Sequence, residues 1–317
     1  MTLRNAFGRS ETALNSEVFH PVLARLTEPT QRKLSMSLKQ KLFKPSIRFI
    51  KAGLRITGAT GAKLSAALSE ELIPTAPVET KYGTIHFFCP GRIPLFRAET
   101  LATKEPETIE WIDSFKGNSV FWDIGANVGI YSLYASLQKG VQVLAFEPAA
   151  SNYYVLNRNI QINQRDDSIL ALCIAFNDVT RLDHFNMGNT AIGSADNNQF
   201  ASVTDCLGQP FSPKFKQGMI GFTIDEFVEK FNPKFPNHIK IDVDGIESKI
   251  IAGGSKTISD PRVESILVEL DDNQPDDSRL VISSIEQAGF KLTKKEHAPM
   301  CDSSKYSSIY NHIFVRT

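Results

Sequence analysis

The stretch Ser119-Val-Phe-Trp-Asp-Ile-Gly-Ala-Asn-Val-Gly129 decides the fold of this chain. Val120 to Ile124 is predicted to be a buried strand, the glycines form a tight turn, and Val128 to Leu137 follows a helical pattern. A second apolar run, Val141 to Glu147, ends in an acid eighteen residues after Gly129. This order is typical of nucleoside-binding α/β sheets, in which the backbone approaches the ligand and the acid accepts hydrogen bonds from the ribose hydroxyls.

The spacing of the glycines discriminates between two kinds of nucleoside ligand. Dinucleotide sites carry G-x-G-x-x-G, but Ala126, Asn127 and Val128 separate Gly125 from Gly129, so the middle glycine is missing. Asp123 instead places a carboxylate at the strand end, where it would repel a pyrophosphate and attract a cation. We therefore expect S-adenosylmethionine, whose reacting sulfur is cationic. The alternative is an ordinary turn between strand and helix, with Asp123 only marking the helix entry.

The rest of the chain alternates apolar strands with helical patterns from about residue 80 to its end. The final two strands, Phe290–His297 and Ser307–Arg316, have only turn-like residues between them and are expected to pair as an antiparallel hairpin. We predict a Rossmann-like α/β fold with a mostly parallel sheet, an antiparallel C-terminal hairpin strand and helices on both faces. Further strands are predicted at Ile169–Ile174, Ile239–Val243 and Ser265–Leu270, and a helix at Glu105–Phe115.

Two segments depart from this alternation. Residues 176–222 are rich in Asn, Gly and Pro, and so long a connection is usually functional, so we expect a cap or substrate-facing insertion beside the cofactor. Residues 1–80 form a basic N-terminal extension, with no acid and nine Lys or Arg between Pro29 and Ser69. Apolar residues at helical spacing predict two short amphipathic helices there.

The extension has two interpretations. Residues 30–60 could contact an anionic membrane surface, a glycolipid or a nucleic acid, or their apolar face could pack on the catalytic domain with the lysines in solvent. No run of 18 apolar residues occurs, so no spanning helix is expected. The four cysteines are far apart and the start lacks a secretory pattern, which favours a cytoplasmic protein, peripheral to a membrane if the first interpretation holds.

Residues 81–317 resemble the class I S-adenosylmethionine-dependent methyltransferases of the FkbM family. The resemblance is carried by Thr103-Lys-Glu-Pro-Glu-Thr-Ile-Glu-Trp-Ile112, by Phe121 to Gly129, by Ala145-Phe-Glu-Pro148, by Lys240-Ile-Asp-Val-Asp-Gly-Ile-Glu247 and by Asn311-His-Ile-Phe-Val-Arg316. One position departs, because Asp244 stands where the family usually has Glu.

The resemblance implies O-methylation of a small-molecule or glycan acceptor, such as a sugar, glycolipid, polysaccharide or polyketide-like hydroxyl. By position it implies that Glu147 takes the ribose hydroxyls and that Ala175 and Phe176 lie at the adenine. It places the methionine and ribose end of the cofactor against Asp123, Gly125, Ala126, Asn127 and Gly129.

Methyl transfer to an alcohol needs an aligned acceptor and a group that removes its proton. Asp242 follows the fourth strand, where ligands bind, and is our candidate for cofactor-amine anchor or general base. Lys240 shares one strand face with Asp242 and could pair with it; the alternative is a structural ion pair. Glu269 ends the fifth strand near the same crevice. The segment after the fourth strand lacks an aromatic clamp, so nucleobase methylation and nucleic-acid partners are not expected.

Three other hypotheses compete with this one. Asp242, Asp272 and Asn273 are similar to the magnesium ligands of catechol-type O-methyltransferases, but a solvated acidic loop before Pro275 is the favoured explanation. A nicotinamide oxidoreductase is disfavoured by the absent glycine. A non-catalytic cofactor-binding scaffold would be attached through the basic extension. His184, His312 and Arg97 are weaker site candidates. The sequence determines neither the acceptor nor the oligomeric state.

Overall fold

The computed structural model describes residues 44–195, 198–203, 210–243, 245–297 and 307–317. The chain divides into two compact units, Met1–Leu72 and Ile73–Thr317. In the first unit residues 44–56 are helical and α2 spans Gly58–Leu72. Of the two predicted basic helices, the one after Pro45 corresponds to helix 44–56. The one around residues 34–42 lies outside the described residues, as do residues 30–43 of the predicted contact segment. Helix α2 was not predicted. No helix in the described part of the chain has the length and apolar character needed to cross a membrane.

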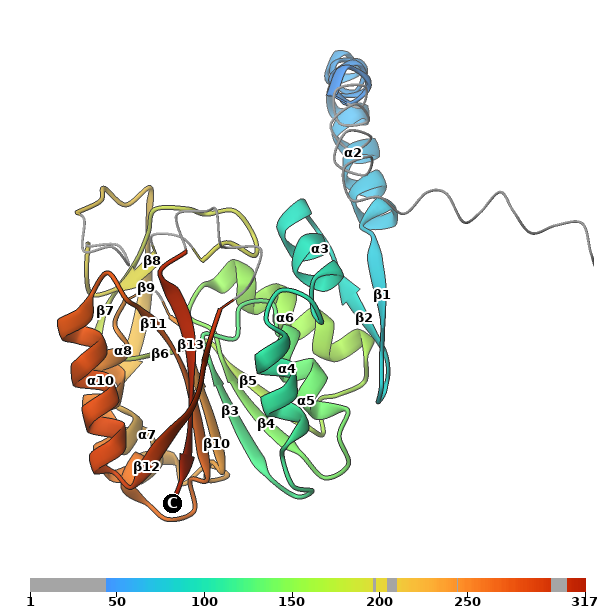
Figure 1. The fold of residues 1–317 in the computed structure, drawn as a ribbon. Helices are drawn as coiled ribbons and strands as arrows, with labels where there is room; N and C mark the ends of the chain where they lie inside the picture. Colours follow the sequence, from blue (N-terminus) through green and yellow to red (C-terminus); the bar gives the residue numbers. More distant parts are fainter. Residues whose placement is uncertain (1–43, 196–197, 204–209, 244, 298–306) are drawn as a thin grey trace, which may run out of the picture. The chain divides into compact units, whose positions relative to one another are not determined.

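A seven-stranded sheet forms the centre of the second unit, in the order β12-β13-β11-β10-β3-β4-β5 (Figure 1). Strands β5, β4, β3, β10 and β11 run parallel, and β13 is antiparallel to both β11 and β12. The predicted C-terminal hairpin is thus confirmed. The strands are β3 Val120–Ile124, β4 Gln142–Phe146, β5 Ile169–Leu172, β10 His238–Ile241, β11 Ser265–Asp271, β12 Phe290–Glu296 and β13 Ile309–Arg316.

Helices cover both faces of this sheet, as predicted (Figure 1). On one face the apolar sides of α4, α5 and α6 pack with Phe121, Leu267 and Ile313. On the other face α7, α8, α9 and α10 pack around Trp122, Ile239 and other buried strand residues. The helices are α4 Pro106–Asp113, α5 Ile130–Ser136, α6 Ala150–Ile162, α7 Ile224–Phe231, α8 Glu247–Gly253, α9 Ser255–Ser259 and α10 Pro275–Gln287. Because successive strand residues point to opposite faces, the two cores alternate along each strand.

The second unit begins earlier than the predicted boundary at residue 81. Strand β1 (Thr75–Thr80) pairs antiparallel with β2 (Gly83–Phe88), and α3 (Arg92–Glu99) follows. Ala76 and Val78 of β1 pack against the core of this unit. The boundary moves because β1 ends directly before the predicted start and pairs with β2 across the two-residue turn at residues 81–82.

The predicted insertion contains a second sheet of four strands, in the order β6-β9-β7-β8. It buries Phe185, Met187, Phe200 and Met219 in a small core of its own with Ala149 and Ala175. The strands are β6 Ala175–Phe176, β7 Arg181–Met187, β8 Asn198–Phe200 and β9 Phe215–Phe222. The predicted insertion is therefore a small structured layer built on short strands.

Candidate functional site

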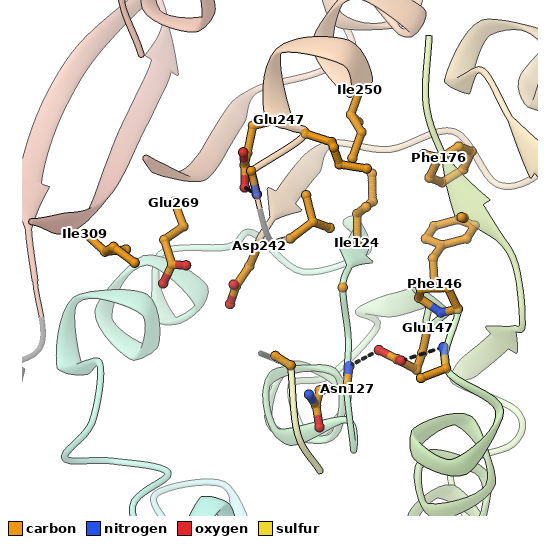
Figure 2. Close-up of a pocket in the computed structure, with 18 of the residues that line it drawn as sticks. Ile124, Asn127, Phe146, Glu147, Phe176, Asp242, Glu247, Ile250, Glu269 and Ile309 are labelled. Carbon is orange, nitrogen blue, oxygen red and sulfur yellow. Dashed lines mark hydrogen bonds between the residues drawn. The ribbon is translucent and has the colours of Figure 1, made fainter. Parts of the chain in front are cut away.

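A cavity of about 410 Å³ opens at the carboxyl ends of the parallel strands (Figure 2). It lies where the strand order reverses: the chain runs outward from β3 to β4 and β5, and then returns to place β10 on the other side of β3. Open α/β sheets bind ligands at this switch point, because the loops after the two central strands diverge there. The cavity is also within the size range of small-molecule sites.

The glycine corner after β3 brings backbone to the cavity. Gly125 has a φ of +87°, and a Cβ at this position would overlap the carbonyl oxygen of Asp242. Gly125 and Asn127 line the cavity, and Ala126 lines a smaller hollow beside it. Gly129 differs from the prediction, since it is not among the lining residues and a Cβ there would overlap Leu156 of α6. Gly129 therefore allows α5 and α6 to pack closely.

Glu147 lies at the end of β4 and faces the same corner (Figure 2). Its carboxylate accepts hydrogen bonds from the backbone N–H groups of Asn127 and Ala149, each at 2.8 Å. Burial raises the pKa of Glu147 to about 7, against the lowering effect of these hydrogen bonds. Beside it, the buried Oδ1 of Asn127 has no partner among the described residues. The Glu147 carboxylate and the Asn127 Oδ1 are thus arranged to accept hydrogen bonds from a ligand that carries donors.

Asp123 does not reach the cavity, contrary to the prediction. It is 1% exposed and accepts a hydrogen bond from Ser132 Oγ at 2.5 Å, while its Oδ1 has no partner among the described residues. The alternation of β3 directs Asp123 toward α5, whereas Ile124 lines the cavity. Burial raises the pKa of Asp123, against the nearby charge of Lys240. The carboxylate that faces the ligand is supplied by another strand.

That carboxylate is Asp242, directly after β10. Lys240 pairs with it, as the spacing suggested, and is 1% exposed. Lys240 also lies in register with Asp123 of β3. Burial lowers the pKa of Lys240, but the carboxylates of Asp242, Glu105 and Asp123 outweigh burial, so the net shift is upward. Lys240 is therefore a permanent buried cation that fixes Asp242 at the edge of the cavity.

A second buried pair, which was not predicted from the sequence, lies at the start of α4. Lys104 and Glu105 form an ion pair and both line the cavity. Glu105 also accepts a hydrogen bond from the Tyr131 hydroxyl at 2.7 Å. Burial raises the pKa of Glu105, but Lys104 and Lys240 outweigh it and hold the pKa at about 2. The signal was available, because two charged residues precede Pro106 within the first family block, but it looked like an ordinary helix start.

Glu269 of β11 lies next to Asp242 and points into the same space (Figure 2). Burial, together with the carboxylates of Asp242 and Glu105, raises the pKa of Glu269 well above its usual range. The protonated form of Glu269 is thus favoured in the free protein. The structure brings together the three residues predicted to be catalytic, with Lys240 behind Asp242 and Glu269 beside it.

The predicted magnesium ligands are not brought together. Both carboxylate oxygens of Asp272 accept hydrogen bonds from Lys295, and Asn273 donates to Ser308 Oγ at 2.8 Å. Neither residue lines the cavity, because both follow β11 on the outer turn, whereas Asp242 does line it. Within the described ranges no group of three His, Cys, Asp or Glu side chains is arranged to hold a metal ion.

The far end of the cavity is apolar. Ala175 and Phe176, predicted to lie at the adenine, line it together with Ile174 and Phe146. The insertion contributes Phe185 and Phe200, so the small sheet does border the cavity as predicted. Of the weaker candidates only Arg97 is a lining residue; it donates a hydrogen bond to the Gly193 carbonyl at 2.8 Å. His184 is exposed on β7, and His312 is buried in β13 away from the lining.

A family model described as the methyltransferase FkbM domain matches residues 123–292, which is more than half of the chain. The chain belongs to the FkbM methyltransferase family. This is a family of S-adenosylmethionine-dependent methyltransferases, so the resemblance seen in the sequence is confirmed.

Several solved structures are similar to this chain at low identity. A methyltransferase FkbM from Methylobacillus flagellatus KT is 16% identical over 63% of this chain and 44% of its own, with a TM-score of 0.42. A precorrin-6y C5,15-methyltransferase from Geobacter metallireducens GS-15 is 12% identical over 78% of this chain and 95% of its own, with a TM-score of 0.40. An S-adenosylmethionine-dependent methyltransferase from Aquifex aeolicus is 12% identical over 73% and 100%, with a TM-score of 0.39. No curated protein matches the chain.

Proposed function

We propose that this chain is an S-adenosylmethionine-dependent O-methyltransferase that acts on a hydroxyl of a sugar, glycolipid, polysaccharide or polyketide-like acceptor. The observation that carries the proposal is the charge of the cavity. Among the described lining residues are seven carboxyl groups and two permanent cations: Glu105, Glu147, Asp242, Glu247, Glu269, Asp271 and Asp277, against Arg97 and Lys104. Such a lining attracts a cation and repels phosphates.

This charge pattern fits the cofactor, which supplies a methyl group activated on a cationic sulfonium and carries a net positive charge. It disfavours a nicotinamide dinucleotide, whose pyrophosphate is anionic and would meet carboxylates at the corner where dinucleotide folds present a helix N-terminus. It equally disfavours nucleic-acid acceptors, whose backbone phosphates would approach the same lining. Glu147, Gly125 and Asn127 would hold the ribose and methionine parts, and Ala175 and Phe176 the adenine.

The acceptor chemistry is assigned to the acidic end of the cavity. Asp242, fixed by Lys240, is placed to anchor the cofactor's ammonium group. Glu269, which lies beside Asp242 in the cavity, would take the proton of the acceptor hydroxyl in its ionised form. The cofactor would supply the methyl group and keep the electron pair of the broken C–S bond on sulfur, while the acceptor oxygen would form the new C–O bond and Glu269 would take the hydroxyl proton. Lys104 and Glu105 line the wall beside these groups.

The test of the proposal combines binding and turnover. Titration calorimetry with S-adenosylmethionine and with NAD should give binding of the first and none of the second. Incubation with methyl-labelled cofactor and a panel of glycosides should then transfer label to oxygen, and the Glu269→Gln variant should lose transfer while still binding cofactor. Binding of NAD alone would reject the methyltransferase assignment for this cavity. Labelled product on nitrogen would reject O-methylation.

The basic extension supports a second proposal, peripheral contact with an anionic membrane. Lys44, Arg48, Lys51 and Arg55 are spaced by four, three and four residues and are exposed on one stripe of helix 44–56. The neighbouring stripe contains Ile47 and Ile50, which are 61% and 57% exposed. A basic stripe beside an exposed apolar stripe is typical of helices that lie in the interface of anionic bilayers.

A further inference from the structure

One residue of the cavity wall has a buried polar group that the proposed chemistry does not use. Asn311 lies on β13, is 3% exposed and lines the cavity. Its backbone is directly opposite Glu269 of β11 in the antiparallel register. Directly opposed residues of an antiparallel pair project from the same face of the sheet, so Asn311 and Glu269 face the same side. A buried amide at this place needs partners for both its ends, since an unpaired end is unfavourable.

The orientation of the Asn311 amide is fixed from behind. Its Nδ2 donates a hydrogen bond of 2.7 Å to Oε1 of Glu107, a residue of α4 that is 1% exposed. An ionised carboxylate can only accept hydrogen bonds, so the NH₂ end of the amide must face Glu107. The Oδ1 end is then left without a partner among the described residues. Asn311 therefore presents a fixed acceptor, for which a ligand would have to supply the donor.

A second acceptor of the same kind lies on the neighbouring strand. Asp271 lines the cavity two residues after Glu269, and thus on the same face of β11. Its Oδ1 accepts from the Asn273 backbone N–H at 2.9 Å, while Oδ2 is buried and has no partner within the described part of the chain. Two partnerless oxygens thus flank the carboxyl group of Glu269, one across the strand pair and one along the strand.

We infer that the β11–β13 pair is the acceptor subsite, built for a neutral ring that carries several hydroxyl groups. This inference rests on the proposed function. Glu269 takes the reacting hydroxyl, and Asn311 and Asp271 accept hydrogen bonds from hydroxyls on neighbouring carbons. Glu107 is a positioning residue that holds the Asn311 carbonyl toward the cavity. Hydroxyls supply the donors that both oxygens lack, and the carboxylates of the wall repel acidic sugars.

The test uses ligand-detected NMR with the full chain saturated by S-adenosylhomocysteine. The probes are methyl α-D-mannopyranoside and methyl α-L-rhamnopyranoside as neutral glycosides, and sodium glucuronate and catechol as competitors of different chemistry. The neutral glycosides should give saturation transfer and the glucuronate should not. A preference for glucuronate or catechol, or no glycoside binding by protein that binds the cofactor product, would overturn the subsite and leave the methyltransferase proposal standing.

Variants separate the subsite from general damage. Asn311→Leu should weaken glycoside binding by about 3- to 10-fold, the loss of one neutral hydrogen bond, with S-adenosylhomocysteine affinity unchanged in calorimetry. Glu107→Gln offers both a donor and an acceptor to Asn311, lets its amide turn, and should weaken the glycosides by a smaller factor. Asn157→Leu, on an exposed position of α6, is the matched control. Glycoside affinities equal to wild type in both Asn311→Leu and Glu107→Gln would overturn the assignment. Absence of S-adenosylhomocysteine binding in the wild type would instead remove the proposed function itself.

Discussion

Replacing Glu147 by Gln tests the cofactor corner most directly. The substitution keeps the shape of the side chain but removes its charge. In the wild type the backbone N–H groups of Asn127 and Ala149 each donate to a carboxylate oxygen of Glu147 at 2.8 Å, and in the variant the NH₂ group of the amide would face one of these two donors. A hydrogen bond to a charged group contributes roughly 1.5–3 kcal/mol and a neutral one roughly 0.5–1.5 kcal/mol. Two ribose hydroxyls would therefore lose about 2–3 kcal/mol together, or roughly 30- to 160-fold in Kd.

The pKa of Glu147 adds a pH dependence with a definite sign. Burial raises this pKa to about 7 in the free protein, so the carboxyl group is increasingly protonated below that value. Ribose hydroxyls donate best to the ionised form, so binding should favour deprotonation and affinity should rise with pH. Below pH 7 the wild type should lose about tenfold in affinity per pH unit, because one pKa unit corresponds to about 1.4 kcal/mol. The Gln variant should show no such dependence.

The assay is titration calorimetry with S-adenosylhomocysteine at pH 6, 7 and 8. Glu110→Gln serves as the matched control, since this glutamate is exposed on α4 and pairs only with Lys294 among the ion pairs of the described residues. The control should bind like the wild type at each pH. The reasoning would be refuted by a Glu147→Gln affinity within twofold of the wild type, or by the same pH slope in both proteins.

Three further predictions concern stability and surface binding. Lys240→Met leaves the buried carboxylate of Asp123 and the partly exposed carboxylate of Asp242 uncompensated and should lower the free energy of unfolding by about 3–5 kcal/mol. Lys295→Met breaks an exposed pair and should change the free energy of unfolding by less than about 1 kcal/mol. Equal shifts of the two urea midpoints would contradict this. Burial, together with the charge of Lys116, lowers the pKa of His238 to about 3 from 6.5, so on acidification the unfolded state binds this proton first. The free energy of unfolding should therefore fall by about 1.4 kcal/mol per pH unit between these values. His238→Gln should lose this part of the slope in urea unfolding at pH 6.5, 5.5 and 4.5, and parallel slopes for the two proteins would show that His238 does not titrate this way. The chain should sediment with phosphatidylglycerol-containing vesicles and not with vesicles of phosphatidylcholine alone. Replacing Lys44, Arg48, Lys51 and Arg55 by Gln should weaken the free energy of vesicle binding by about 1 kcal/mol per residue. Sedimentation unaffected by the four changes would exclude this helix as the membrane contact.

Much of the fold follows from local patterns. Val120 to Ile124 was predicted with the bounds that β3 has, because a short, mostly apolar run that ends at a glycine turn is typical of a buried strand. The glycine corner and the acid after β4 were evident from their spacing, since a positive φ and a close backbone approach restrict those positions in any chain of this type. The hairpin of β12 and β13 was predictable because its strands are neighbours in sequence.

The direction of the side chains relative to the cavity could not be predicted from the sequence. Asp123 and Asp242 both end strands, and only the helix layers covering each face of the sheet determine that Asp242 lines the cavity while Asp123 is buried below it. The start of the second unit was likewise decided by pairing, since β1 is recognisable only through its partner β2.

The sequence by itself determined the family, the glycine corner after β3 and the acid after β4, because these depend on residues close together in the chain. The tertiary structure decided which residues form the wall of the proposed acceptor subsite. Asn311 and Glu107 are 204 residues apart, yet the packing of α4 against the sheet joins them by a hydrogen bond. The reason is physical: periodicity fixes which residues share a face of an element, whereas the order of strands and the covering helices fix which face meets the ligand.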